Sequence, residues 1–266
     1  MKFDRLVTEA IAIALKAGEA ILAVYNSGDF NIEIKGDDSP LTRADIAAND
    51  IIVHGLAQLT PAIPILSEES RQTPYEERKD WTTFWLVDPL DGTKEFIKRN
   101  GEFTVNIALI ENGEPVLGVV YAPVLKRSYF AARGHGAFVQ EDTHPATQIK
   151  VAAYDKGRLK VVASRSHAGP DLQEFLDNIG GYDVVSMGSS LKLCLVAEGK
   201  AHLYPRLGPT MEWDTAAAHA IVNVAGGQVT DLSGKPLSYN KENLLNPYFM
   251  VAGDPPYPWQ NHLRRP

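Results

Sequence analysis

Two apolar runs in the middle of the chain, FTVNIALI and PVLGVVYA, flank a short polar turn that contains Asn112 and Gly113. Asn-Gly adopts the left-handed backbone angles of a two-residue hairpin turn, and it is the strongest short-range hairpin signal in a sequence. Two shorter apolar runs, IPIL and FWLV, precede this pair. The middle of the chain is therefore expected to form a sheet, and we predict that it is antiparallel.

Helical periodicity marks two segments before this sheet. Apolar residues recur on one helical face over residues 3–25. A second helix is predicted over residues 42–59, where Thr42 and Asp45 have the spacing of a capping box. Acids interrupt the first apolar pattern, so we interpret it as an amphipathic helix and not as a signal peptide; they are Asp4, Glu9 and Glu19.

Strand-like and helix-like segments alternate in the last part of the chain, in the order RLKVVA, DLQEFLDNI, YDVVSM, SSLKLCLVAEG, AHLYP and WDTAAAHAIVNVAGG. This alternation is typical of an α/β fold. We therefore place a boundary near Lys150. Residues 1–150 are expected to form an α+β domain with the antiparallel sheet, and residues 151–266 are expected to form an α/β domain that packs closely against it.

The composition excludes several classes of protein. The 266 residues include 26 Lys and Arg against 33 Asp and Glu, which gives a formal net charge of −7. Because no stripe of basic residues stands out, the chain is not expected to bind nucleic acid. No segment approaches the roughly 18 apolar residues of a membrane span, so any membrane contact would be peripheral. Cys194, the one cysteine, lies in an apolar run and is expected to be buried, which favours a reducing cytoplasm.

Acidic residues follow the apolar run FWLV, in the segment WLVDPLDGTKEF. Asp88 and Asp91 project from one tight corner, where they and the carbonyl of Leu90 can converge on a hard cation. Gly92 permits the tight backbone, and Thr93 opens a helix whose free N–H groups suit a phosphate. An Asx turn followed by a helix cap would explain the same spacing without a ligand.

Two further acids stand at the ends of predicted elements. Glu68 follows IPIL, where a solvated loop carboxylate is the usual explanation, and Asp214 precedes a small-residue helix, where it could simply be the N-cap. The small residues Ala216 to Ala218 would let another backbone approach closely. Because these acids and Asp88 all lie at element ends, where loops carry function, we interpret them together as a metal-binding cage.

The acidic segments carry a resemblance to a known family. WLVDPLDGTKEF resembles the Asp-Pro-[Ile/Leu]-Asp-Gly-Thr signature of the inositol-monophosphatase superfamily, SEES resembles its upstream Glu-Glu element, and EWDTAAAHAIVNVAGG its Trp-Asp-x-Ala-Ala motif. Within it, DDSPLTRAD, SRSH and GSSLKLCLVAEGKAHLYPRLGPTMEWDTAA are most similar to the CysQ-type branch of 3'(2'),5'-bisphosphate nucleotidases. The resemblance implies a layered α/β/α/β/α sandwich.

The resemblance also implies a site for magnesium, with two or three ions. Glu68, Asp88 and the carbonyl of Leu90 would hold the first ion, while Asp88, Asp91 and Asp214 would hold the second. Two cations suit phosphate ester hydrolysis because they stabilise both the attacking and the leaving oxygen. Without cations the clustered carboxylates repel one another, so some of their pKa values should rise. The same motifs would contact the substrate through Glu68, Leu90, Asp91, Gly92, Thr93 and Asp214.

The attacking group would be a water molecule that is activated by metal, and no covalent phosphoenzyme is required. Thr93 is placed to orient that water. Its own proton could pass to Asp45 or, in the inositol-phosphatase pattern, to Glu68. Asp45 could also complete the cap of the second helix, and both roles could hold at once.

A substrate with two phosphates needs positive charge away from the metals. The candidate residues are Lys192, which we place one turn into the helix SSLKLCLVAEG, Arg206, which follows a strand, and Arg165 in SRSH. Ser189 and Ser190 at the start of the same helix could also donate to an anion. Each cation alone could be a solvated surface charge, and their place in the CysQ-like segments is what favours a substrate role.

The implied reaction is magnesium-dependent hydrolysis of the 3'-phosphate of adenosine 3',5'-bisphosphate to AMP and phosphate, with the sulfate-carrying analogue as a related substrate. This reaction would serve sulfur assimilation and nucleotide recycling, with inhibition by lithium. The metal cage alone does not select the leaving group, so a phosphatase for inositol monophosphate or fructose 1,6-bisphosphate stays open. A non-catalytic nucleotide sensor is a third hypothesis. It should have lost a site residue, yet all five are present: Glu68, Asp88, Asp91, Thr93 and Asp214.

Overall fold

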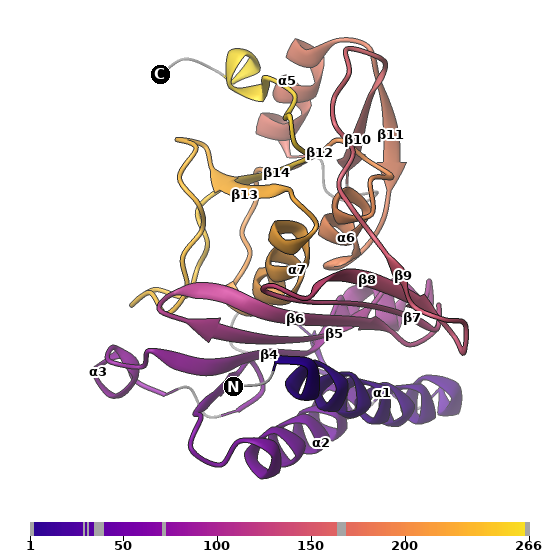
Figure 1. Ribbon diagram of the computed structural model, residues 1–266. Coiled ribbons are helices and arrows are strands. Elements are labelled where there is room, and N and C mark those ends of the chain that lie inside the picture. Colours follow the sequence, from indigo (N-terminus) through magenta and orange to yellow (C-terminus); the bar gives the residue numbers. More distant parts are fainter. Residues whose placement is uncertain are drawn as a thin grey trace.

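Two β-sheets with helices between and outside them make up the structure (Figure 1). It is a computed structural model that describes residues 3–28, 30, 32–34, 40–70, 73–163 and 169–263. From the bottom of the view to the top, the layers are α1 and α2, a seven-stranded sheet, α6 and α7, a five-stranded sheet, and α5. The mixed α/β class and the α/β/α/β/α order of layers are therefore confirmed.

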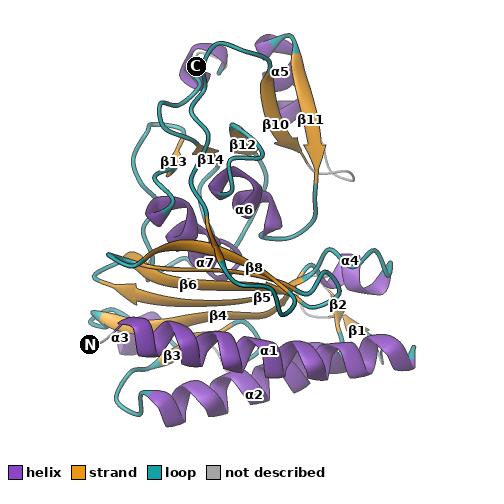
Figure 2. Cartoon of the chain, turned by 45° about the vertical axis from the view of Figure 1, so that its right-hand side comes forward, coloured by secondary structure: helices purple, strands orange, loops and turns teal. Residues whose placement is uncertain are grey.

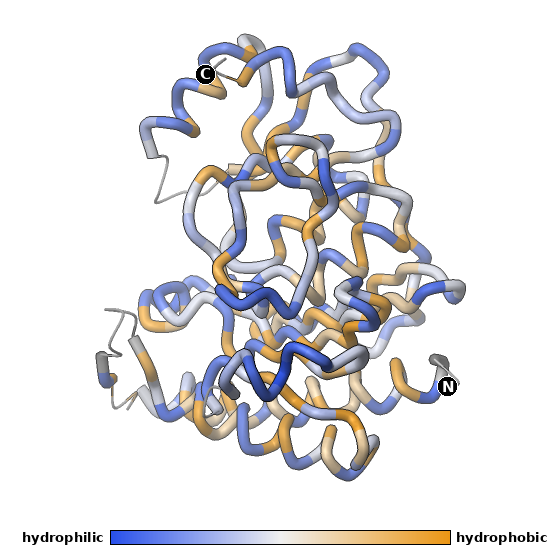
Figure 3. The backbone as a smooth tube through the Cα atoms, turned by 90° about the vertical axis from the view of Figure 1, so that its left-hand side faces the viewer, coloured by the Kyte–Doolittle hydropathy of each residue, from blue (hydrophilic) through white to orange (hydrophobic). Residues whose placement is uncertain are grey.

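The two helices that open the chain are α1 (Phe3–Ser27) and α2 (Arg43–Leu59), and they lie side by side beneath the first sheet (Figure 2). Both helices were predicted, and so was the capping box of α2. The side chain of Thr42 accepts from the backbone N–H of Ala44, while Asp45 accepts from the backbone N–H of Thr42. Hydrophobic and hydrophilic residues alternate along these helices, as their amphipathic pattern requires (Figure 3).

The seven-stranded sheet runs in chain order, through β3 (Ile65–Ser67), β4 (Thr83–Asp91), β5 (Thr104–Glu111), β6 (Glu114–Ala122), β7 (Arg127–Ala132), β8 (Gly136–Glu141) and β9 (Thr147–Gln148). The predicted hairpin joins β5 to β6, and Asn112 and Gly113 have φ angles of 52° and 78°. The antiparallel prediction is wrong for β3 and β4, which pair in parallel. The reason is that the chain returns through the short helix α3 (Tyr75–Arg78) before it enters β4.

The five-stranded sheet has the order β11-β10-β12-β14-β13. Its strands are β10 (Leu159–Ala163), β11 (Tyr182–Ser186), β12 (Leu203–Arg206), β13 (Gln228–Asp231) and β14 (Phe249–Ala252). The first three are parallel, as an α/β pattern predicts, but β14 is antiparallel to β12 and β13. α5 (Pro170–Ile179) and the 3₁₀ helix Trp259–His262 cover its outer face.

The helix α7 (Glu212–Val224) lies between the two sheets and contacts strands of both. Its partner in this layer is α6 (Leu191–Ala197). The small residues of α7 allow a close approach, as predicted: Gly118 in β6 faces the carbonyl of Ala217 so closely that a Cβ there would overlap the carbonyl oxygen. The chain passes from the first sheet to the second between β9 and β10. The boundary near Lys150 stays a prediction.

Cys194 lies in α6 and is fully buried, as expected from its apolar neighbours. Burial raises the pKa of its thiol well above the usual range, so at neutral pH it is a small apolar side chain and not a nucleophile. Among the described residues, no helix has the length and apolar character to span a membrane.

Candidate active site

The ends of β3 and β4 bring two acids together. These strands are parallel, so their carboxyl ends meet at one edge of the sheet. Glu68 is the first residue after β3, and its backbone N–H donates to the carbonyl of Val87 at 3.1 Å. Asp88 follows Val87 in β4 and is 2% exposed, and one of its carboxylate oxygens accepts from the backbone N–H of Leu90 at 3.0 Å. The predicted association of Glu68 with Asp88 therefore follows from the strand pairing.

Asp214 reaches the same place from the first turn of α7. One carboxylate oxygen from each of Glu68, Asp88 and Asp214 lies within 4.8 Å of the others. The alternative prediction that Asp214 is the N-cap is wrong. The helix starts at Glu212 with Met211 as N-cap, and Asp214 accepts from the backbone N–H of Met211 at 2.9 Å. We call these three acids the acidic cluster.

Burial and mutual repulsion perturb the acidic cluster. Burial is the main cause that raises the pKa of Asp88 well above its ordinary value, and the charges of Glu68, Asp91 and Asp214 add to it. The pKa of Asp214 is also raised, first by burial and then by Asp91. Protein groups alone therefore do not compensate these charges. Oxygen donors in this arrangement are what a hard divalent cation prefers.

Asp91 lies beside the acidic cluster but is held by other groups. Its Oδ2 accepts from the backbone N–H of Ser190 at 2.6 Å and from the side-chain amide of Asn106 at 3.4 Å. Burial raises its pKa, whereas nearby Lys192 lowers it. Asn106 was not predicted as a site residue, although a polar residue inside the apolar run FTVNIALI was the available signal. A direct role of Asp91 in metal binding stays a prediction.

Thr93 and Asp45 meet although they are far apart in the sequence. Thr93 is the first residue of α4 (Thr93–Ile97), and its hydroxyl lies 3.4 Å from Asp45 Oδ1 and 3.4 Å from the carbonyl oxygen of Leu90. The other Asp45 oxygen accepts from the hydroxyl of Thr42 at 2.6 Å and from its backbone N–H at 2.8 Å. The helix cap and the contact to Thr93 thus use different oxygens of one buried carboxylate.

A cavity of about 600 Å³ opens beside Asp91 and Asp214, and its lining also includes Lys192 and Arg206. Lys192 is 9% exposed and is the second residue of α6, so the prediction that it lies one turn into the helix is wrong. Burial lowers the pKa of Lys192, and the charge of Arg206 lowers it further. Arg206 ends β12 and donates to the carbonyl of Pro209 at 2.7 Å.

Each of these two cations has a donor nitrogen that no acceptor among the described residues pairs. Within the described part of the chain, Lys192 Nζ forms no hydrogen bond or ion pair, and the buried Nε of Arg206 has no hydrogen-bond partner. Arg165 lies outside the described residues. The hydroxyl of Ser189 donates to the carbonyls of Asp91 and Glu102, and Ser190 Oγ pairs with Thr104 and Asn106. Both side chains thus form hydrogen bonds within the protein.

The layered fold and the acids at its sheet edge define a class of protein. The chain belongs to the inositol monophosphatase family, which it matches over residues 3–259. Two curated relatives carry the name 3'(2'),5'-bisphosphate nucleotidase CysQ. That of Salmonella typhimurium is 54% identical over 249 residues, which is 93% of this chain and 99% of that protein. That of Escherichia coli K12 is 52% identical with the same coverage.

Solved structures are similar to this chain over most of its length. CysQ from Bacteroides thetaiotaomicron, described as a bacterial member of the inositol monophosphatase family, has a TM-score of 0.85 and 46% identity. The match covers 95% of this chain and 98% of that one. The extragenic suppressor protein suhB from Bartonella henselae has a TM-score of 0.80 at 26% identity over 94% of each chain.

Proposed function

We propose that this chain is a magnesium-dependent phosphomonoesterase that hydrolyses the 3'-phosphate of adenosine 3',5'-bisphosphate to AMP and phosphate. One observation carries the proposal: Asp214 of the acidic cluster lines the same cavity as Lys192 and Arg206, two cations that protein acceptors leave incompletely paired. The curated relatives named 3'(2'),5'-bisphosphate nucleotidase, at 52–54% identity, support the choice of substrate. The sulfate-carrying analogue would be a second substrate, and the role would lie in sulfur assimilation and nucleotide recycling.

The acidic cluster fits divalent cations, because its donors are hard oxygens whose charges repel one another. Glu68, Asp88 and the carbonyl of Leu90 would hold one magnesium ion. Asp88, Asp91 and Asp214 would hold a second. Bound magnesium would supply positive charge to the phosphate oxygens and would activate water for attack.

Thr93 and Asp45 would manage the proton of the attacking water. The hydroxyl of Thr93 would accept a hydrogen bond from that water and pass its own proton to Asp45 Oδ1, which lies 3.4 Å away. The other Asp45 oxygen is fixed by Thr42, so Oδ1 stays directed at Thr93. This arrangement favours Asp45 over Glu68 as the base, because Glu68 is committed to the acidic cluster.

Lys192 and Arg206 would bind the phosphate that is not cleaved. The two side chains carry like charges, and Arg206 is close enough to lower the pKa of Lys192. An anion bound between them would relieve this repulsion. Arg165, in the segment SRSH, would assist them. Because these side chains would contact the leaving group and not the scissile phosphate, they would make the enzyme discriminate between bisphosphate nucleotides and inositol phosphates.

Phosphate release tests the proposal. Adenosine 3',5'-bisphosphate, inositol 1-phosphate and fructose 1,6-bisphosphate are compared as kcat/KM with magnesium and with EDTA. We expect the adenosine bisphosphate to be preferred by more than about tenfold, a difference of about 1.4 kcal/mol, and only with magnesium. Preference for an inositol or sugar phosphate would refute the assigned substrate, and folded protein that hydrolyses none of them would favour a nucleotide sensor. A cytoplasmic location, with or without peripheral attachment to the inner membrane, stays a prediction.

A further inference from the structure

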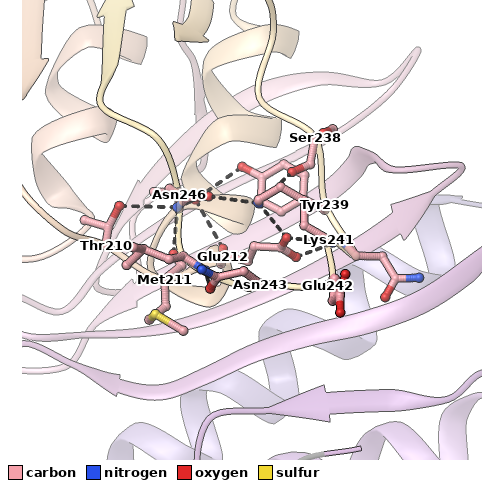
Figure 4. Close-up of polar contacts among 12 residues, drawn as sticks. Thr210, Met211, Glu212, Ser238, Tyr239, Lys241, Glu242, Asn243 and Asn246 are labelled. Carbon is pink, nitrogen blue, oxygen red and sulfur yellow. Dashed lines mark hydrogen bonds and ion pairs between the residues drawn. The ribbon is translucent and has the colours of Figure 1, made fainter. Parts of the chain in front are cut away.

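A loop late in the chain, residues 238–246, lies against the start of α7 and against the first half of the molecule. We call it the strap. Figure 4 shows its polar contacts around Glu212 and Asn246. The strap lies outside the acidic cluster and lines no part of the cavity described above. Its contacts nevertheless join the element that carries Asp214 to the part of the chain that leads into β4.

The strap holds the first turn of α7 through Glu212. This side chain is fully buried, and its carboxylate accepts from the backbone N–H groups of Asn240 and Lys241, at 2.7 and 3.0 Å. It also accepts from Lys241 Nζ at 2.6 Å. Three donors from the strap therefore converge on one carboxylate, two residues before Asp214. A buried charge with this many partners fixes the backbone that carries it.

Asn246 provides a second attachment to the same turn. Its side-chain amide donates to the carbonyl of Met211 at 2.8 Å and to the hydroxyl of Thr215 at 3.0 Å. The backbone adds two hydrogen bonds, from Glu212 N–H to the carbonyl of Leu244 and from Asn246 N–H to the carbonyl of Thr210. Met211 is the residue whose N–H binds the carboxylate of Asp214. The strap therefore binds Thr210 and Thr215, the residues on either side of the segment in which Met211 contacts Asp214.

The other side of the strap is held by Arg78 at the end of α3. Arg78 is 3% exposed, and its guanidinium donates to Asn240 Oδ1 and to the carbonyls of Lys241 and Glu242, at 2.7–3.0 Å. In return, the side chain of Asn240 donates to the carbonyl of Arg78 at 2.7 Å. Arg78 lies between Glu68 and Asp88 in the chain. The strap thus connects the segment that joins these two acids with the turn that carries the third.

We infer that Arg78 and Glu212 are positioning residues, which through the strap fix Asp214 at metal-binding distance from Glu68 and Asp88. The inference rests on the proposed function only in that the acidic cluster binds divalent metal. Metal sites tolerate displacements of only a few tenths of an ångström in their ligands, so the element that sets the separation of two ligand-bearing segments sets the affinity. Neither residue belongs to the acidic cluster or lines the cavity.

The test measures metal binding and not turnover alone. Mn²⁺ is titrated calorimetrically into metal-free Arg78→Met and Glu212→Gln, and thermal unfolding is followed with and without Mn²⁺. We expect the Mn²⁺ dissociation constant to rise about tenfold or more, the usual effect of losing a group that orients a ligand. The control is Arg158→Met, because this arginine also pairs with a carboxylate, that of Asp183 at 2.6 Å, but is 69% exposed, and its partner lies in β11, an edge strand of the five-stranded sheet.

The outcomes separate positioning from a purely structural role. Arg78 and Glu212 act through one loop, so the double variant should bind Mn²⁺ no more weakly than the weaker-binding single variant. If Arg78→Met does not fold, Lys241→Met serves in its place, since it removes one of the three donors to Glu212 from a side chain that is 30% exposed. Folded variants that bind Mn²⁺ within twofold of the wild type, with a lowered Tm, would overturn the inference. Wild-type protein that binds no Mn²⁺ would refute the proposed function itself.

Discussion

The contact between Gly118 and α7 gives a sharp test of how the site is positioned. In Gly118→Ala, the added Cβ would lie 2.9 Å from the carbonyl carbon of Ala217 and 3.0 Å from the Cβ of Ala220, and it would overlap the Ala217 oxygen. Cβ atoms essentially never come within 3.0 Å of another heavy atom. The overlapped atoms belong to helix backbone, so α7 itself must move away from β6. Asp214, in the first turn of that helix, moves with it.

The size of the effect follows from the cost of overpacking, about 1–3 kcal/mol for a buried methyl group without space. For a chain of this length each kcal/mol lowers Tm by about 2–4 °C, so we expect a loss of about 2–12 °C without metal. Metal that draws Asp214 back toward Asp88 must work against the same strain, and each 1.4 kcal/mol of strain weakens binding tenfold. Calorimetric titration with Mn²⁺ and thermal unfolding measure the two quantities.

Gly181→Ala is the matched control, because a Cβ at this exposed glycine would meet no atom within 4 Å. It should leave both Tm and metal affinity unchanged. A Gly118→Ala protein that is indistinguishable from Gly181→Ala in both measurements would refute the reasoning. It would mean that α7 relaxes without disturbing Asp214.

Three further predictions concern charge. Asp88→Asn should abolish phosphatase activity yet raise the Tm of the metal-free protein at pH 8. Burial and repulsion disfavour the charged carboxylate of Asp88 in the folded state, and each unit by which they raise its pKa is a cost of about 1.4 kcal/mol that uncharged Asn does not carry. A lower Tm of this variant in EDTA would contradict the prediction. Burial lowers the pKa of His219 to about 3, so below its ordinary value near 6.5 the unfolded chain binds a proton that the folded chain does not. Stability should therefore fall by about 2 kcal/mol between pH 6.5 and 5, and urea unfolding of His219→Gln should show a smaller fall, whereas equal slopes would refute the assignment. Lys192→Met should lower kcat/KM for adenosine 3',5'-bisphosphate by about tenfold to a hundredfold, because one hydrogen bond to a charged group is lost. The kcat/KM for adenosine 3'-monophosphate should stay within a few-fold of the wild-type value. Equal losses on both substrates would argue against a role for Lys192 at the second phosphate.

Elements with strong local signals could be predicted from the sequence. The opening helices have a sustained apolar face, and the turn at Asn112 and Gly113 requires left-handed angles that these residues supply. The start of α7 was misplaced because its N-cap, Met211, has none of the usual capping side chains. The capping partner is the later Asp214, which accepts from the Met211 N–H. The parallel pairing of β3 with β4 depends on where the intervening loop crosses, which the two short apolar runs do not specify.

The acids of the site could be predicted because each follows a recognisable segment, and three of them meet as expected. Their surroundings could not. Asn106 and Ser190 orient Asp91 through contacts between distant parts of the chain. The strap residue Asn240 reaches Glu212 from 28 residues further along the chain. No periodicity or spacing in the sequence marks such contacts between distant segments. They become visible only when the fold has placed the segments side by side.

The cavity has one consequence for how new substrates arise in such a fold. Among its lining residues, Asp91 ends β4 of the first sheet, whereas Lys192 and Arg206 come from α6 and β12. On the proposed roles, selection could therefore alter the residues that would meet the leaving group while the acids that would hold metal at the scissile phosphate stay constant. Exchange of the α6–β12 segment between relatives should transfer substrate preference without rebuilding the chemistry, which makes this segment the natural place to graft new selectivity.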